Sequence, residues 1–341
     1  MYIGIDIGYS SVKLAFGTEQ HPVVQTLPVG AARRNQMATG EDDTHQIGSG
    51  FLVMVNDEEW VAGVSPGDIP GFTRIMDNDY PKSAEYLALF RAALSRVGAA
   101  IVDQVVIGLP VFQFKDEGQR AELKRRLEGR HYIRPDFVVD VRSVKVIAQP
   151  AGTLGHHLNI QASLPASERI KSDDIVLIVD PGHFSIDWVV YRRGFDTNAA
   201  GSTSTAGESI VQAAAAALSK EYGVSVRVPR LERAILAGMS VVSAGKTEIP
   251  FQKALEEQAA KIVDANLKVI RGSVRRVAES EGVDVILMTG GSAGLFAPAL
   301  AEKFPESRVV VTPDNVMANA RGFFKLASAA AGKRTGSVMA A

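Results

Sequence analysis

The sequence contains no cysteine among its 341 residues. Disulfides, thiolate metal sites and cysteine nucleophiles are therefore excluded, and the composition fits a reducing compartment. An excess of charge of one sign is also missing, because 37 basic and 38 acidic residues leave a formal net charge of -1. Without a net basic field, we expect no direct binding to nucleic acid or to an anionic membrane surface.

Long apolar runs are missing as well. No segment reaches the roughly 18 consecutive apolar residues of a membrane span, and Asp6 lies where a signal peptide would be apolar. The sequence therefore predicts a cytoplasmic protein without membrane association. Its 46% hydrophobic content and its length predict a sizeable core divided into two or more domains.

The first pattern present is strand, turn, strand. Residues 2–17 alternate apolar and small polar side chains on both sides of an Asp-x-Gly turn that begins at Asp6. Residues 175–191 repeat this pattern without a gap, with Asp180 in the position of Asp6, which indicates a weak internal repeat. The other equivalent pairs are Gly8 and Gly182, Ser11 and Ser185, Val12 and Ile186, and Lys13 and Asp187.

Both turns carry the groups of a phosphate site. Backbone N–H groups and the hydroxyl of Ser185 can bind phosphate oxygens, Lys13 adds a positive charge, and Asp6 and Asp180 can each hold a water molecule of Mg²⁺. The alternative for either turn alone is an ordinary β-turn, because Asp and Gly are favoured turn residues. The ordered pair favours phosphate binding.

A third turn, residues 289–294, follows a buried strand and precedes an apolar helical run. Its glycines and helix-terminal N–H groups can contact a nucleotide's base or phosphate. The alternative is a plain strand-to-helix turn. The segment lacks the dinucleotide spacing G-x-G-x-x-G, and the chain has no P-loop lysine motif.

The remaining pattern predicts alternating strands and helices. The expected strands are residues 104–110 and 142–152 and a hairpin over 51–64 that turns at Asn56-Asp57, and the expected helices are residues 82–97, 208–220, 251–281 and 315–327. Between Gly152 and Asp174 we expect irregular structure, with His156 and His157 in a solvated loop rather than a metal site.

Five segments resemble, in this order, the nucleotide-site motifs of the actin, Hsp70 and sugar-kinase superfamily. They are IGIDIGYSSVKLAFG, VVIGLPVF, VIAQPAG, LIVDPGHFSIDW and VILMTGGSAGLF, and together they span most of the chain. Within the superfamily, the length, the hairpin and the closing ANARGF resemble the ParM/StbA plasmid-segregation family, and DPGHFSIDW resembles proteins labelled PRTRC system protein D.

This resemblance implies an α/β, actin-like ATPase fold of two ribonuclease-H-like lobes, with ATP or GTP and Mg²⁺ in a cleft between them. We expect lobe I over residues 1–150, with a β-rich insertion at about 20–98. We expect lobe II over 151–327, with a helical insertion at about 215–282 and a closing helix at 315–327 that packs back toward lobe I. Residues 328–341 are expected to be a disordered tail.

The resemblance also implies the site residues. Gln149 is expected to orient the attacking water, because a neutral amide cannot act as a general base. Asp6 and Asp180 are expected to act in catalysis and in the magnesium shell. The expected nucleotide-binding residues are Gly8, Tyr9, Ser10, Ser11 and Lys13 in the first turn, Gly182, His183, Phe184 and Ser185 in the second, and Gly290, Gly291, Ser292 and Ala293 in the third.

Two residues depart from the family pattern. Pro181 removes an amide donor, and His183 stands where many relatives have glycine, so that it either reaches the terminal phosphate or packs over the turn. Hydrolysis is expected to be slow, and these changes either weaken it or abolish it.

Three functions compete. The leading hypothesis is a weak ATPase that polymerises with itself and segregates plasmid DNA through a DNA-bound adaptor protein. The alternatives are a non-polymerising scaffold gated by nucleotide and a small-molecule kinase of the same superfamily. A chaperone is disfavoured, because no peptide-binding domain follows the expected core.

Overall fold

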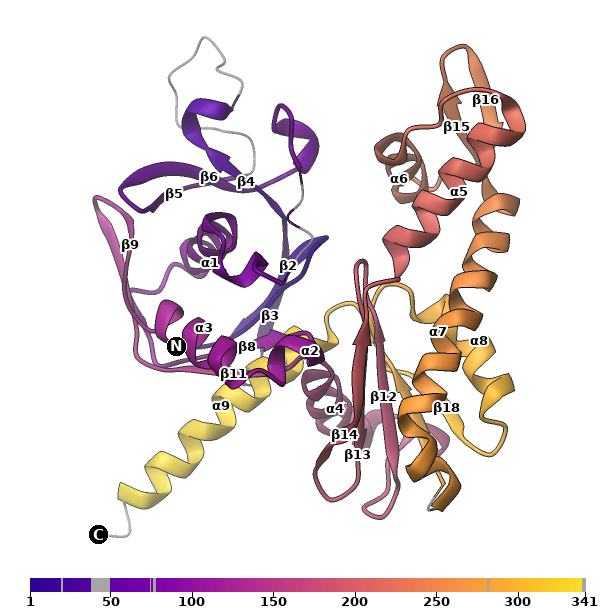
Figure 1. The fold of residues 1–341 in the computed structure, drawn as a ribbon. Coiled ribbons are helices and arrows are strands. Elements are labelled where there is room, and N and C mark those ends of the chain that lie inside the picture. Colours follow the sequence, from indigo (N-terminus) through magenta and orange to yellow (C-terminus); the bar gives the residue numbers. More distant parts are fainter. Residues whose placement is uncertain (20, 38–49, 74, 76–77, 281, 339–341) are drawn as a thin grey trace. The chain divides into compact units, whose positions relative to one another are not determined.

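The computed structural model describes all residues except 20, 38–49, 74, 76–77, 281 and 339–341. The chain forms two compact units (Figure 1). Unit 1 consists of Met1–Ile170 and Thr312–Ala341, and unit 2 consists of Lys171–Val311. No helix among the described residues is long and apolar enough to span a membrane.

Unit 1 is built on a five-stranded sheet in the order β11-β8-β1-β2-β3. The alternation read at the start of the sequence is confirmed, because β1 and β2 form an antiparallel pair in which Asp6 lies opposite Lys13. The strands β8 and β11 run parallel to β1 and extend the sheet on its other side. The bounds are β1 (Tyr2–Ile7), β2 (Ser11–Gly17), β3 (Pro22–Pro28), β8 (Gln104–Leu109) and β11 (Val144–Ala148).

Among the described residues, two small sheets and the α-helices α1, α2 and α3 complete the N-terminal part of unit 1. The expected hairpin is confirmed: Asn56 and Asp57 connect β5 to β6 with positive φ angles of 52° and 62°, as a two-residue type I′ turn requires. The strands are β4 (Gly30–Arg33), β5 (Phe51–Val55), β6 (Glu58–Val64), β7 (Ile101–Val102), β9 (Gly129–Arg134) and β10 (Phe137–Val141), and the helices are α1 (Ala84–Val97), α2 (Val111–Phe114) and α3 (Glu117–Leu127).

The helix α1 follows from its local sequence. The Ser83 hydroxyl caps its first turn by accepting from the N–H of Tyr86, and Gly98 ends it in the left-handed conformation with φ 71°. Its apolar residues, among them Phe90 and Leu94, are buried in the core of unit 1. The expected helix is therefore confirmed, and it begins two residues later than the sequence indicated.

Two further helices, α4 (Gln149–Ile160) and α9 (Ala318–Val338), pack against each other and carry glycine at their contact. A Cβ atom at Gly322 of α9 would overlap the carbonyl oxygen of Gly152 of α4, and a Cβ atom at Gly4 of β1 would overlap the backbone of α9. α9 also packs against β1 and β8 (Figure 1). Small residues thus allow two helices and a sheet to approach at backbone distance.

Unit 2 contains a second five-stranded sheet in the order β14-β13-β12-β17-β18. β12 and β13 form an antiparallel pair with Asp180 opposite Asp187, and β17 runs parallel to β12. This is the arrangement of β1, β2 and β8 in unit 1, so the internal repeat is a structural one. The bounds are β12 (Val176–Pro181), β13 (Ile186–Tyr191), β14 (Phe195–Thr203), β17 (Val285–Met288) and β18 (Arg308–Val311). The helix α8 (Ala293–Lys303) packs against β18, β12 and β17.

An inserted subdomain forms the upper end of unit 2 in Figure 1. It has a small hydrophobic core of its own, formed by residues of α5, α6, a hairpin and the start of α7. The two long helices were expected, whereas the hairpin inside the expected helical insertion was not. The elements are α5 (Gly207–Tyr222), α6 (Val228–Leu236), β15 (Val241–Ala244), β16 (Thr247–Pro250) and α7 (Gln252–Ser280).

Three expectations need correction. The segment after Gly152 is not irregular, because it continues the helix α4. His156 and His157 are consequently not solvated: they lie on α4 with exposed fractions of 6% and 0%. The tail expected from residue 328 onward is helical through Val338, since its alanines favour helix.

The division of the chain also differs from the boundary expected near residue 151. In the structure, unit 1 extends to Ile170, and the chain enters unit 1 again at Thr312. The packing of α4 along α9 explains this, because the helix that follows β11 belongs to the same core as the closing helix.

Candidate functional site

Asp6 is the centre of the first candidate site, which lies wholly in unit 1. Its carboxylate is buried, with 1% of the residue exposed. The amine of Lys13 lies 3.1 Å from Oδ2, and the side-chain amide of Gln149 donates to Oδ1 over 2.8 Å. Both oxygens therefore have a donor, which offsets the loss of hydration on burial. Asp6, Lys13 and Gln149, three of the expected site residues, come together as one cluster.

The turn between β1 and β2 is closed by a short backbone hydrogen bond. The N–H of Gly8 donates to the carbonyl of Ser11 over 3.1 Å. Ser10 at the tip is exposed and Ser11 is half-buried, so the tip presents its hydroxyl to solvent. The ring of Tyr9 stacks on Tyr80, with ring centroids 4.9 Å apart.

The turn between β12 and β13 repeats that backbone geometry in unit 2. The N–H of Gly182 donates to the carbonyl of Ser185 over 2.9 Å. Asp180 occupies the position of Asp6 and is also buried, with 8% exposed. The two turns thus share both the internal hydrogen bond and the carboxylate at the end of the first strand.

The side chains around the second turn differ from those around the first. Where β2 has Lys13, β13 has Asp187, which is 2% exposed and accepts from the hydroxyl of Ser185 over 2.8 Å. The hydroxyl of Ser202 on β14 donates to its other oxygen. Sequence reasoning aligned Asp187 with Lys13 but did not foresee that Ser185, expected at the phosphate, donates its proton to this carboxylate.

Carbonyl groups of the second turn accept hydrogen bonds from two neighbouring elements. The carbonyl of Pro181 accepts from the N–H of Ser292 over 3.1 Å. The carbonyl of Gly182 accepts from the N–H of Gly207, at the start of α5, over 3.4 Å and from the hydroxyl of Ser292 over 3.5 Å. The second turn is therefore fixed to the third turn and to the inserted subdomain.

His183 adds a side-chain contact to the same subdomain. Its Nε2 lies 3.7 Å from a carboxylate oxygen of Glu232 on α6, and its backbone carbonyl accepts from the N–H of Glu208 over 2.7 Å. Phe184 beside it is half-buried. His183 therefore contacts the inserted subdomain, a contact that neither sequence-based interpretation of this residue included.

The third turn packs directly against Asp180. Gly290 has a positive φ of 81°, and a Cβ atom there would overlap a carboxylate oxygen of Asp180 and lie 2.7 Å from the carbonyl of Pro181. Gly291 has no heavy atom within 4 Å of such a Cβ. Gly290 is therefore required by backbone conformation and by close approach, a role that the sequence did not reveal. Ser292 and Ala293 then lead into α8.

The acidic groups suit a hydrated magnesium ion. Among the described residues, no three His, Asp or Glu side chains form a cluster that could hold a metal ion. Mg²⁺ usually keeps several waters and is held by one or two carboxylates together with substrate phosphates. Asp6 in unit 1 and Asp180 in unit 2 are each a buried carboxylate at the end of a strand, the type of group that would hold such an ion.

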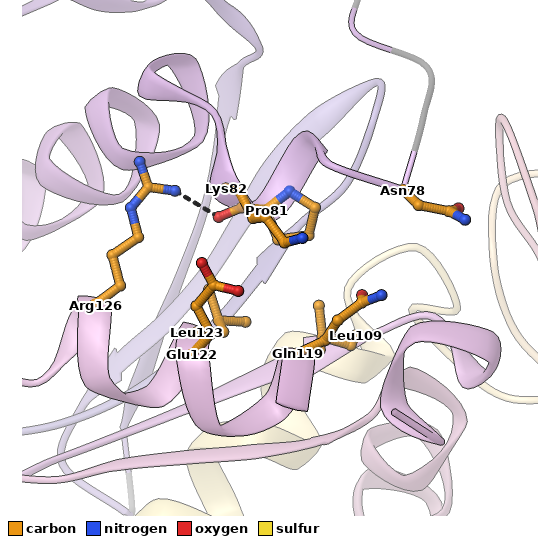
Figure 2. A pocket seen from close by; sticks show the side chains of 8 residues that line it. All are labelled: Asn78, Pro81, Lys82, Leu109, Gln119, Glu122, Leu123 and Arg126. Atoms are coloured by element: carbon orange, nitrogen blue, oxygen red, sulfur yellow. Dashed lines mark hydrogen bonds between the residues drawn. The ribbon is translucent and has the colours of Figure 1, made fainter. Parts of the chain in front are cut away.

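A narrow pocket elsewhere in unit 1 lies between α3 and the segment that precedes α1 (Figure 2). Arg126 of α3 donates to the carbonyls of Pro81 and Ser83 over 2.7 Å and 2.6 Å. The guanidinium thus holds α3 to the chain before α1. The lining residues are Asn78, Pro81, Lys82, Leu109, Gln119, Glu122, Leu123 and Arg126, and none belongs to the expected site.

Comparisons with known proteins agree on the fold. Residues 4–152 match the family model described as actin like proteins N terminal domain. A search of curated proteins finds no match.

Solved structures of actin-like proteins align with nearly the whole chain. The archaeal actin homolog Ta0583 aligns with a TM-score of 0.75 and 17% identity, over 96% of this chain and 100% of that one. Its complex with ADP has a TM-score of 0.71 and 19% identity, with 96% and 100% covered. A 15-stranded ParM filament from Clostridium botulinum gives 0.71 and 17%, with 96% and 98% covered. The chain therefore has the actin-like fold, and its first 150 or so residues match the N-terminal domain family of actin-like proteins.

Proposed function

We propose that this chain is an actin-like nucleotide-binding protein that assembles into filaments with Mg-ATP or Mg-GTP, hydrolyses the nucleotide slowly and acts in plasmid or DNA segregation. The observation that carries the proposal is the repeated strand, turn, strand element, with Asp6 and Asp180 at equivalent places and the same N–H to carbonyl bond in each turn. Backbone N–H groups of such a turn can bind phosphate oxygens.

The similar structures support assembly and nucleotide binding. One of them is a filament and another contains ADP. A near-neutral composition, with a formal net charge of -1, favours an adaptor protein over direct contact with DNA. The partners proposed are therefore further copies of this chain and a DNA-bound adaptor, in the cytoplasm.

Gln149 is the residue proposed to orient the attacking water. Its NH₂ group donates to Asp6, which leaves the amide oxygen as the group that can accept a hydrogen bond from water. A neutral amide positions water without removing its proton, and this fits slow hydrolysis. Bound Mg²⁺ would supply charge neutralisation at the phosphates, with Asp6 and Asp180 holding its waters.

A second function, a scaffold that binds nucleotide without turnover, is favoured by the second turn. Pro181 has no N–H to offer, and the Ser185 proton is donated to Asp187. Both features reduce the number of donors available to a phosphate. This alternative predicts nucleotide binding that is unaffected by loss of Gln149.

The proposal is tested by Asp180→Asn with Asp57→Asn as the matched control. Both changes remove one carboxylate charge, and Asp57 is an exposed residue of the hairpin turn with a positive φ that Asn tolerates. Titration with fluorescent ATP in Mg²⁺ should show affinity weakened by about tenfold or more for Asp180→Asn only, since charge-assisted contacts contribute about 1.5–3 kcal/mol. Unchanged binding, hydrolysis and assembly in Asp180→Asn would refute the site.

A further inference from the structure

Both connections between the two units begin beside one helix. The chain leaves unit 1 after Ile170 and re-enters it at Thr312. Residues next to each crossing contact the same helix of unit 1, α4 (Gln149–Ile160). α4 therefore holds the two places where the chain passes to and from unit 2.

His157 makes both of these contacts with a single ring. Its Nε2 lies 2.8 Å from the carbonyl oxygen of Glu168, and its Nδ1 lies 3.2 Å from the hydroxyl of Thr312. A carbonyl can only accept, so Nε2 carries the proton and Nδ1 accepts from the Thr312 hydroxyl. Beside it, His156 contacts the carbonyl of Pro313 through Nε2 at 3.3 Å. The two histidines tie both crossing segments to α4.

Burial keeps this arrangement in one protonation state. His157 is fully buried, and burial lowers the pKa of its ring, against the opposing effect of its bond to the Glu168 carbonyl. A neutral ring has one donor and one acceptor nitrogen, which are the two functions that the contacts require.

The other end of α4 is the candidate site. Gln149, the first residue of α4, donates to Asp6. Gln149 and His157 are eight residues apart, which corresponds to about 12 Å along the helix at 1.5 Å per residue. In between, the hydroxyl of Thr153 donates to Asn319 over 2.8 Å, and Gly152 meets α9 at backbone contact. The helix is thus held along its length, so a shift at the His157 end moves the Gln149 end.

We propose that His157 is a positioning residue: by binding Glu168 and Thr312 it fixes α4, and through α4 it fixes the Gln149 amide at Asp6. The effect on hydrolysis rests on the proposed role of Gln149. The mechanical link does not, so it can be measured in nucleotide-free protein.

The first test is hydrogen exchange of the full chain carrying Thr312→Val. This near-isosteric change removes the hydroxyl that donates to His157. The amide to follow is that of Thr153, the first in α4 that can bond to a carbonyl of its own helix. Loss of one net hydrogen bond, about 1 kcal/mol, should speed its exchange about fivefold.

The control is Thr26→Val, which removes a hydroxyl of β3 that contacts the sulfur of Met317. It should leave exchange at Thr153 unchanged. Faster exchange confined to residues near 157 and 312 in Thr312→Val would overturn the proposal. If Thr312→Val does not fold, His157→Gln serves instead, because its amide can still donate to Glu168 while the Thr312 contact is lost.

The second test is a double-mutant cycle on ATP hydrolysis with Gln149→Met. Thr312→Val alone should lower kcat several-fold with little change in nucleotide affinity, and it should have no further effect once Gln149 is replaced. Additive effects would show that His157 acts independently of Gln149. If the wild-type protein lacks turnover while exchange at Thr153 responds as expected, the proposed hydrolysis fails and the positioning of α4 stands.

Discussion

Gly290 is the residue at which the third turn meets the second. Its φ is +81°, and the space that a Cβ would need is taken by Asp180 and Pro181. Both the conformation and the contact therefore require glycine. The neighbouring Gly291 has open space around it, so the two adjacent glycines of one turn have different roles.

Replacing these glycines one at a time tests that difference. Gly290→Ala should lower the free energy of unfolding by about 2–4 kcal/mol, since a left-handed Ala costs about 1–2 kcal/mol and the overlap with Asp180 adds to this. Gly291→Ala should change it by less than about 1 kcal/mol. Urea unfolding of both variants measures the effect, and equal losses would contradict this account of Gly290.

His131 is the buried histidine that should make stability depend on pH. It is 3% exposed, and burial lowers its pKa to about 4, opposed by its hydrogen bond to the Leu127 carbonyl and reinforced by the charge of Arg91. In the unfolded chain the pKa is about 6.5. Between these two values the unfolded chain binds more protons than the folded one, so stability falls as pH falls.

The expected change is a loss of about 3 kcal/mol from His131 as pH decreases from about 6.5 to about 4. His131→Gln, which keeps an amide donor for the Leu127 carbonyl, should reduce this slope in denaturant titrations across the same pH range. An unchanged slope would show that other groups, such as His156 and His157, whose pKa values are also lowered by burial, account for it.

At the scale of elements, the local sequence predicted those strands and helices whose apolar residues recur with a regular period. The alternation in residues 2–17 and 175–191 and the apolar spacing of α1 were predicted correctly, because a buried face imposes a period of two or 3.6. The aligned Asp6 and Asp180 were found for the same reason.

What the sequence did not reveal depends on contacts between distant segments. The start of α4, Gln149-Pro150-Ala151-Gly152, has the composition of a turn, and only its packing against α9 shows why glycine is needed there. The burial of His157 follows from Glu168 and Thr312, which lie in separate parts of the chain. Likewise, the partnership of Ser185 with Asp187 and Ser202 depends on the pairing of β13 with β14.

The contact of α4 with α9 gives a prediction for these elements. Gly322→Ala should destabilise unit 1 by about 2–3 kcal/mol, because its Cβ would overlap the backbone of Gly152. Gly272→Ala is the matched control on α7, where nothing lies within 4 Å, and it should stabilise by about 0.5–1 kcal/mol through helix propensity. Thermal unfolding distinguishes the two, and a stabilising Gly322→Ala would contradict the packing described for α9.

At the scale of the whole molecule, each unit contains one acidic strand, turn, strand element. The first has Lys13 and Gln149 at its carboxylate, whereas the second has Asp187 nearby and is bonded to the inserted subdomain through Gly207, Glu208 and His183. Unit 1 therefore carries Gln149, the residue proposed to orient the attacking water. Unit 2 carries the contacts that connect its turn to the inserted subdomain.

Assembly driven by nucleotide is the central claim of the proposed function. Right-angle light scattering of the purified chain after addition of Mg-ATP, followed until the nucleotide is consumed, tests it most directly, with ADP as the control. Scattering is expected to rise with ATP, to decay as ATP is hydrolysed, and to persist longer in Gln149→Met. A flat trace from protein that binds ATP in a separate titration would contradict nucleotide-driven assembly by this chain and favour the nucleotide-gated scaffold.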